Sequence, residues 1–367
     1  MCKKSSLLLL VLVVLPVFSG CLNSPLKKVW SFTFENSFYF PDLVFSNDGV
    51  YTYYIDKVYF LSAETGDVLW VYDAGGEVSS LITEGERVYF LSERKNYSYL
   101  YCLDTSTGDQ DWKKEVAPYS YFTVYNDRIY IYSDGLICLD AVTGDTIWSY
   151  SEIGYYCASV LSPPVAGEGK VVIGSFVCAS GKRTYVYDYR LYCFDTETGN
   201  LLWEYKCEGG PSTLLIYKGK IYNSNAYGVQ CLDLTTGEEL WRDNVGKVSR
   251  SVAADGKLYI TPWSTDVVCL DAETGKELWR CEIVGKEVEM HHPIDSVAIW
   301  LSPEVVDKKV YTGSQVKNRY VYCLDAETGD LLWKYNKGKH WYSSPVVGNG
   351  KIYYATVDGI YCFEIFE

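Results

Sequence analysis

The sequence predicts an all-β fold, an eight-bladed β-propeller made of four-stranded antiparallel blades. The 367-residue chain carries seven copies of a motif in which a Thr-Gly pair is followed by Trp, and an eighth Trp lies nearer the N-terminus. Aromatic residues make up 16% of the chain, with 35 Tyr and 11 Trp, and this composition favours strands over helices. Units of about 40 residues that repeat in this way are typical of propeller blades.

The motif predicts the last two strands of each blade and the turn between them. The copy at residues 322–333 reads Tyr-Cys-Leu-Asp-Ala-Glu-Thr-Gly-Asp-Leu-Leu-Trp. Gly supplies a positive φ at the turn, and the Asp side chain can accept hydrogen bonds from nearby backbone N–H groups. Because the Trp recurs in every unit, we expect a structural role, with each indole packed between neighbouring blades. These residues are Trp30, Trp70, Trp112, Trp148, Trp203, Trp241, Trp279 and Trp333.

A second repeated signal predicts the first two strands of each blade. Turns such as Asp255-Gly256 are followed by Lys or Arg and then by an apolar residue and Tyr. Such Gly-containing turns join the strands of hairpins. Trp30 lacks the first half of its unit, and the missing half lies at residues 360–363. The last blade is therefore predicted to be closed by the N-terminal strand, which removes an open edge.

The first residues predict an export signal rather than part of the fold. Lys3 and Lys4 precede an apolar run at residues 7–17, which is too short to span a membrane. The following Phe18-Ser19-Gly20-Cys21 resembles a lipobox. We therefore expect a lipoprotein signal peptide at 1–20, a lipid on Cys21, a tether at 21–27 and a single propeller at 28–367. This places the protein on the outer face of the cell membrane, with simple secretion as the alternative.

The repeat is similar to the quinoprotein-type, or PQQ-like, propeller repeat, and the likeness covers nearly all of the chain from Val29 onward. Together with the lipobox, the chain resembles the BamB-like lipoproteins. That resemblance implies a monomeric, non-catalytic scaffold that binds other extracytoplasmic or membrane proteins. Two alternatives stay open: a ligand- or carbohydrate-binding propeller, and a quinoprotein dehydrogenase that holds pyrroloquinoline quinone and calcium. Such dehydrogenases carry a Cys-Cys pair that this sequence lacks, so we expect no cofactor and no catalytic residue.

Charge and composition disfavour nucleic acid and metal ions as binding partners. The formal net charge is −14, which disfavours nucleic acid as a partner because phosphate binding requires basic patches. Only 3 His are present, and the adjacent His291 and His292 would point apart in an extended loop, so we expect no metal site.

The cysteines follow the repeat. Seven of them take the same position on the third strand of a blade, and we expect buried thiols that are too far apart to pair. Cys157 and Cys178 lie off the repeat, and either a disulfide between them or two free thiols is consistent with the sequence.

Loop lengths predict where partners bind. If the strands of a blade are A to D from the inside outward, the B–C and D–A connections share one end of the ring, here called the B–C/D–A face. The extra residues of long units fall on this face, at 149–161, 176–189, 280–301 and 315–320, and binding usually occurs in such loops. Packing of the long loops themselves is the alternative. Asn96 begins an Asn-Tyr-Ser glycosylation acceptor there. The candidate binding residues are Tyr155, Tyr156, Trp263, His291, His292, Trp300, His340, Trp341 and Tyr342.

Overall fold

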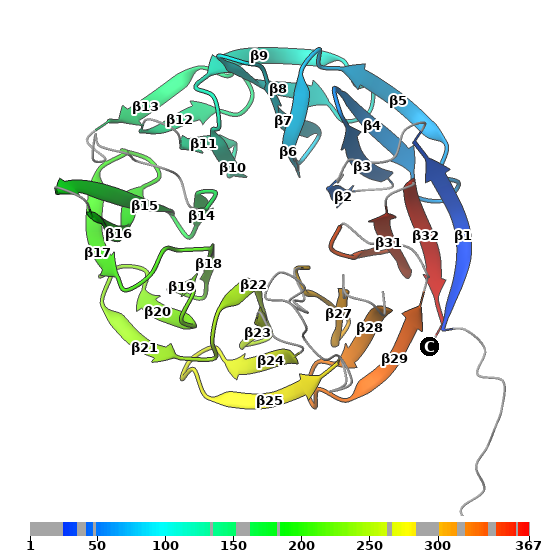
Figure 1. Ribbon diagram of the computed structural model, residues 1–367. Helices are drawn as coiled ribbons and strands as arrows, with labels where there is room; N and C mark the ends of the chain where they lie inside the picture. The colour runs from blue at the N-terminus through cyan, green and yellow to red at the C-terminus, as the bar shows by residue number, and fades with distance from the viewer. Residues whose placement is uncertain are drawn as a thin grey trace, which may run out of the picture.

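The computed structural model describes residues 25–34, 42–46, 49–132, 135–151, 162–181, 184–262, 266–283, 301–313, 320–336, 343–356 and 359–366, and the side chains of 176–187 and 249 are not described. These residues form β-strands arranged in eight four-stranded sheets around a central axis (Figure 1). The predicted all-β, eight-bladed propeller is confirmed. None of the described segments forms a helix that could cross a membrane.

Each blade is an antiparallel meander whose strand A is innermost and whose strand D is outermost (Figure 1). The strands of blades 1 to 4 are β2 (Leu43–Ser46), β3 (Gly49–Tyr54), β4 (Lys57–Ser62) and β5 (Val68–Asp73); β6 (Glu77–Glu84), β7 (Arg87–Glu93), β8 (Ser98–Asp104) and β9 (Gln110–Val116); β10 (Tyr121–Tyr125), β11 (Arg128–Tyr132), β12 (Leu136–Asp140) and β13 (Thr146–Tyr150); and β14 (Val165–Gly167), β15 (Lys170–Gly181), β16 (Thr184–Asp195) and β17 (Leu201–Cys207).

The remaining blades follow the same order. Blades 5 to 8 contain β18 (Thr213–Tyr217), β19 (Lys220–Ser224), β20 (Val229–Asp233) and β21 (Glu239–Asp243); β22 (Val248–Ala254), β23 (Lys257–Pro262), β24 (Asp266–Asp271) and β25 (Glu277–Glu282); β26 (Glu304–Val306), β27 (Lys309–Gly313), β28 (Tyr320–Asp325) and β29 (Leu331–Asn336); and β30 (Val346–Gly348), β31 (Lys351–Thr356), β32 (Gly359–Ile365) and β1 (Leu26–Thr33).

The ring closes as the sequence predicts. Strand β1 is the outermost strand of blade 8 and pairs antiparallel with β32, so Trp30 lies opposite Cys362 (Figure 1). Leu26 and Lys27 already belong to β1. The N-terminal strand is therefore hydrogen-bonded to the C-terminal one. Both strands belong to blade 8, which lies next to blade 1 in the ring.

The core is a ring of interfaces between blades. One cluster combines Tyr89 and Cys102 of blade 2 with Ile131 and Leu139 of blade 3, and all four are almost completely buried. Seven further clusters of the same kind join neighbouring strands or blades around the ring. Because strands B and C contribute most of these side chains, the inner and outer strands carry the surfaces that face solvent.

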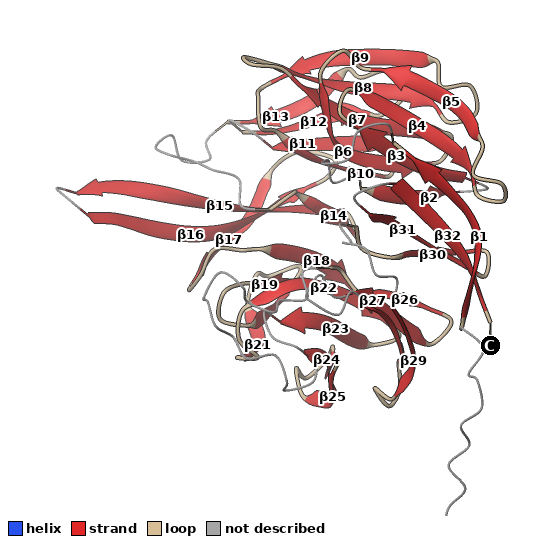
Figure 2. Cartoon of the chain, turned by 45° about the vertical axis from the view of Figure 1, so that its right-hand side comes forward, coloured by secondary structure: helices blue, strands red, loops and turns tan. Residues whose placement is uncertain are grey.

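Blade 4 differs from the others in one feature. The expectation of a loop at residues 176–189 is wrong for 176–181 and 184–189, where the backbone continues as regular strand. Strands β15 and β16 pair from Lys170–Asp195 out to Gly181–Thr184 and project beyond the neighbouring blades (Figure 2). The segment is rich in Tyr and Val, which favour strands, and this explains why the added length extends the hairpin.

Candidate functional site

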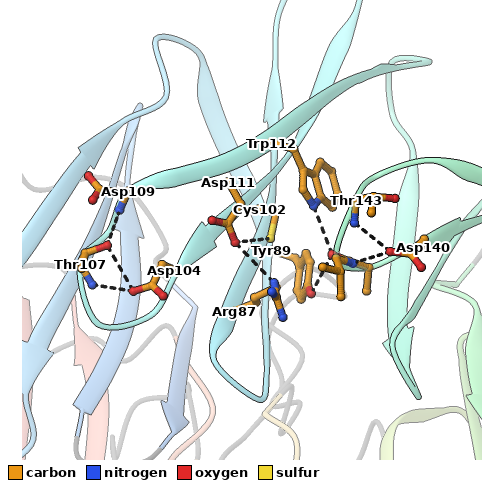
Figure 3. Close-up of polar contacts among 12 residues, drawn as sticks. Arg87, Tyr89, Cys102, Asp104, Thr107, Asp109, Asp111, Trp112, Asp140 and Thr143 are labelled. Atoms are coloured by element: carbon orange, nitrogen blue, oxygen red, sulfur yellow. Dashed lines mark hydrogen bonds and ion pairs between the residues drawn. The ribbon is translucent and has the colours of Figure 1, made fainter.

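The repeated Trp residues connect neighbouring blades through one shared acceptor. The indole Nε1–H of Trp112 and the hydroxyl of Tyr89 both donate to the backbone carbonyl of Ala141 in blade 3, each at 3.2 Å (Figure 3). Trp148 and Trp203 donate to Thr196 and Leu234. At four more joints between blades, a Trp indole and a Tyr hydroxyl likewise donate to one shared backbone carbonyl. These are Trp30 and Tyr353 to Ala63, Trp70 and Tyr51 to Thr105, Trp241 and Tyr222 to Ala272, and Trp279 and Tyr259 to Ala326.

The Gly of each Thr-Gly turn packs against the Trp of the preceding blade. Gly144 has φ +74°, and a Cβ added there would lie 2.9 Å from Cδ2 of Trp112. Gly is therefore required twice, by the positive φ and by the indole that occupies the space of a side chain.

The repeated Asp holds the turn in shape. Its carboxylate accepts the backbone N–H groups of the next residues, as Asp140 does from Thr143 at 2.8 Å and Asp104 from Thr107 at 2.9 Å (Figure 3). The Ser106 hydroxyl and these backbone N–H groups hold the pKa of Asp104 below its usual range. These carboxylates are thus engaged in the turns and are unsuited to acid–base chemistry.

The thiols on the third strands are buried and unreactive. Cys102, Cys138, Cys193, Cys231, Cys269, Cys323 and Cys362 are all free and buried. Burial raises the pKa of Cys102 to about 12 and that of Cys138 to about 11, so neither forms a nucleophilic thiolate near neutral pH. Cys207 is also free and buried, and Cys281 is partly exposed.

The disulfide prediction lies beyond the described atoms. Cys157 falls outside the described residues, and the side chain of Cys178 on β15 is not described. Cys21 is also outside them. Within the described part of the chain, no three His, Cys, Asp or Glu side chains are grouped as metal ligands would be.

The loop residues proposed to bind partners also fall outside the described ranges. This applies to Tyr155, Tyr156, Trp263, His291, His292, Trp300, His340, Trp341 and Tyr342. Asn96 is described: it is exposed in the B–C connection between β7 and β8.

Two carboxyls beside the innermost strands have raised pKa values. Burial raises the pKa of Glu304, at the start of β26, to about 7, and its carboxylate accepts the N–H of Val347 of blade 8 at 2.9 Å. Burial also raises the pKa of Asp42, which directly precedes β2 and accepts the hydroxyl of Tyr53 at 3.3 Å. Glu304 therefore connects two blades.

A pocket of about 600 Å³ opens between blades 2 and 3. Val116, Ile131, Ile137 and Leu139 supply its apolar wall, and Lys114 lies on the blade 2 side. Most of its remaining lining residues come from strand ends near the B–C/D–A face and include Asn96, Tyr97, Glu115, Ser149, Tyr150 and Ser151, whereas Thr146 lies at the C–D end of β13.

A change in the repeat coincides with the pocket. The second residue after the repeated Trp is aromatic in five blades, as Phe32, Tyr72, Tyr150, Tyr205 and Tyr335. Its ring contacts the next blade in several of them: Tyr150 lies 4.9 Å from Phe194, and Tyr335 lies 5.4 Å from Phe363, between ring centroids. The other three blades have Lys114, Asp243 and Cys281 there, and the pocket lies beside Lys114 of blade 2.

The comparisons with known proteins agree with the fold. The sequence matches the family described as outer membrane protein assembly factor BamB over residues 27–121, 97–216, 225–315 and 301–363. The chain belongs to this family. It is similar to the crystal structure of BamB from Moraxella catarrhalis, with 18% identity and a TM-score of 0.66 over 93% of this chain and 100% of that chain.

Enzymes also share the fold of this BamB-family chain. A europium-containing methanol dehydrogenase superposes with a TM-score of 0.67 at 12% identity, over 92% of this chain and 86% of that chain. The tetrathionate hydrolase of Acidithiobacillus ferrooxidans is 25% identical over 278 residues, which are 69% of this chain and 53% of that protein. The chain thus spans about half the length of this curated relative.

Sequence reasoning missed the pocket between blades 2 and 3. An available signal was the repeat itself, because Lys114 stands where most units have an aromatic residue. A comparison of units at that position marks three of them, with Lys114, Asp243 and Cys281, and the joint with the pocket is one of these.

Proposed function

We propose that this BamB-family protein is a lipid-anchored, extracytoplasmic scaffold that binds other proteins and catalyses no reaction. The observation that carries the proposal is the family match along nearly the whole chain. The lipobox-like sequence at Cys21 supports the anchor, and the family description supports a role in protein assembly at a membrane.

The chemistry of the repeat supports a non-catalytic role. The residues that look reactive in sequence, such as Asp104, Cys102 and Tyr89, are engaged in turns, buried or hydrogen-bonded between blades. Among the described residues, no three His, Cys, Asp or Glu side chains converge as the acidic ligands of a calcium site would.

The shape of the ring supports binding on the B–C/D–A face. The β15–β16 hairpin projects beyond the other blades, so its backbone extends blade 4 toward a partner (Figure 2). The opposite end of the ring carries the short Asp-Thr-Gly turns, whose polar groups already bond to one another. A partner therefore finds more variable surface at the B–C/D–A face.

Anchoring is tested by a Cys21→Ala variant expressed in the native host. We expect the wild-type protein in the membrane fraction and the variant in the soluble extracytoplasmic fraction. An unchanged membrane fraction would remove lipidation from the proposal.

Partner binding is tested with a photo-crosslinking amino acid placed at two exposed lysines. Lys95 lies in a B–C connection and Lys276 in a C–D turn, so the two positions sample opposite faces. We expect a discrete crosslinked protein from position 95 and none from position 276; the reverse pattern would contradict the proposed face. Saturable one-to-one binding of pyrroloquinoline quinone with calcium to the purified protein would contradict the non-catalytic role.

A further inference from the structure

The pocket between blades 2 and 3 has a shape suited to a small molecule. It lies between β9 of blade 2 and β11 to β13 of blade 3, which are adjacent in the ring (Figure 1). Its volume of about 600 Å³ falls within the range of small-molecule sites. In five other blades, this position between blades is occupied by an aromatic ring from the outer strand, as with Tyr72 against Phe90 and Tyr101.

The wall of the pocket is apolar and rigid. Ile131 and Leu139 are almost completely buried, and they belong to the cluster that joins the two blades. Val116 and Ile137 are partly buried and pack against that cluster. Because these side chains lie on paired strands of the ring, the pocket is formed before any ligand arrives. An apolar body in the pocket would bury surface of Val116 and Ile137, because at most 1% of Ile131 and Leu139 is still exposed.

A cation lies beside this apolar wall. Lys114 Nζ donates to the carbonyl of Gly144 at 2.8 Å and to the Thr146 hydroxyl at 3.0 Å, and both acceptors are neutral. Arg87 and Lys220 pair instead with the carboxylates of Asp111 (Figure 3) and Glu273, whereas Lys351 also donates to a neutral carbonyl, that of Ala63. The ammonium group can therefore gain a charge-assisted hydrogen bond from an anionic group.

One acidic residue also lines the pocket. Glu115 follows Lys114 on β9, and successive side chains of a strand point to opposite faces of the sheet. Its carboxylate is exposed, so it contributes to the rim and is hydrated. A ligand anion bound at Lys114 would feel a modest repulsion from it.

We propose that this pocket binds a small amphipathic anion, with an aromatic or branched aliphatic body against Val116 and Ile137 and a carboxylate or sulfonate on the ammonium of Lys114. The site goes beyond the scaffold function and does not depend on it. The ligand replaces the ring that five other blades supply from within the chain.

The test uses two fluorescent probes with the purified chain. The anionic probe is 8-anilinonaphthalene-1-sulfonate, and the neutral probe is N-phenyl-1-naphthylamine, which has nearly the same aromatic body. We expect saturable one-to-one binding of both, with the anion tighter. Lys114→Tyr restores the ring found in other blades and should abolish binding of both probes. Lys114→Met should weaken the anion about tenfold and leave the neutral probe within twofold, because it removes the charge alone.

A matched control comes from the neighbouring residue. The Lys113 ammonium lies over the rings of Tyr99 and Tyr101, at 5.1 and 5.9 Å from their centroids, and Lys113 does not line the pocket. Lys113→Met should leave both affinities unchanged, and Glu115→Gln should strengthen the anion slightly. A melting temperature for Lys114→Tyr at or above that of the wild type shows that the variant is folded. Undetectable binding to the wild type, or binding that survives Lys114→Tyr, would overturn the proposal.

Discussion

The contact between a turn Gly and the preceding Trp makes a sharp stability prediction in blade 6. Gly275 lies in the C–D turn of this blade and Gly256 in its A–B turn. Their φ angles are almost the same, +72° and +77°. A Cβ at Gly275 would lie 2.5 Å from Cε3 of Trp241, whereas a Cβ at Gly256 would meet nothing within 4 Å. Alanine at the two positions therefore separates backbone strain from a clash with the indole.

The magnitudes follow from these two effects. Placing Ala in the left-handed region costs about 1 kcal/mol at either site. At Gly275 the overpacked side chain adds roughly 1–3 kcal/mol, because the indole is also held by its hydrogen bond to Ala272. We expect Gly256→Ala to lower the free energy of unfolding by about 1 kcal/mol and Gly275→Ala to lower it by about 3 kcal/mol.

Urea titrations followed by circular dichroism measure both values on the purified chain, and differential scanning calorimetry provides a second measurement. A double variant identifies the cause. If the clash with Trp241 is responsible, Trp241→Ala with Gly275→Ala should lose less stability than the sum of the two single variants, by about 1–3 kcal/mol. Equal losses for the two Gly variants, or strict additivity in the double variant, would refute the reasoning.

Three further predictions follow from buried groups. Burial raises the pKa of Glu304 from 4.5 to about 7, so the folded protein keeps a proton that the unfolded chain releases, and stability falls as pH rises between these values. Glu304→Gln should gain at most about 3 kcal/mol at pH 8 and nothing at pH 4, as measured by urea unfolding at each pH. Tyr222→Phe should cost about 1 kcal/mol in the same assay, because Trp241 still donates to Ala272; a loss above 3 kcal/mol would contradict this. Iodoacetamide should label Cys281 before the eight buried thiols described, and mass spectrometry that finds equal rates would contradict their burial.

The fold could be predicted because the same contacts recur in every unit of the repeat. The Trp, Gly and Asp of each unit meet their partners in the next unit or in their own turn, so their spacing along the chain reflects contacts in space. The closing strand could be predicted for the same reason, since Trp30 is recognisable without the rest of its unit.

The extended hairpin and the pocket could not be predicted in this way. Residues 176–189 have no counterpart in the other units, so a comparison of units predicts no strand pairing for them. The pocket depends on three strands of blade 3 and one of blade 2, and no pattern within a single strand reveals a space between blades. The aromatic position is changed not only at Lys114 but also at Asp243 and Cys281, so the comparison of units does not by itself locate the pocket.

The joint between blades 7 and 8 is built differently from the other seven. In each of those, the Gly of a Thr-Gly turn covers the preceding Trp, as Gly329 covers Trp279. Blade 8 takes its third and fourth strands from opposite ends of the chain, so no such turn exists to cover Trp333. Leu26 of β1 joins the cluster there together with Trp333, and β1 pairs with β32 along its length. Strand pairing therefore replaces the turn. A lipid on Cys21 would anchor β1, the strand that closes the ring, to the membrane.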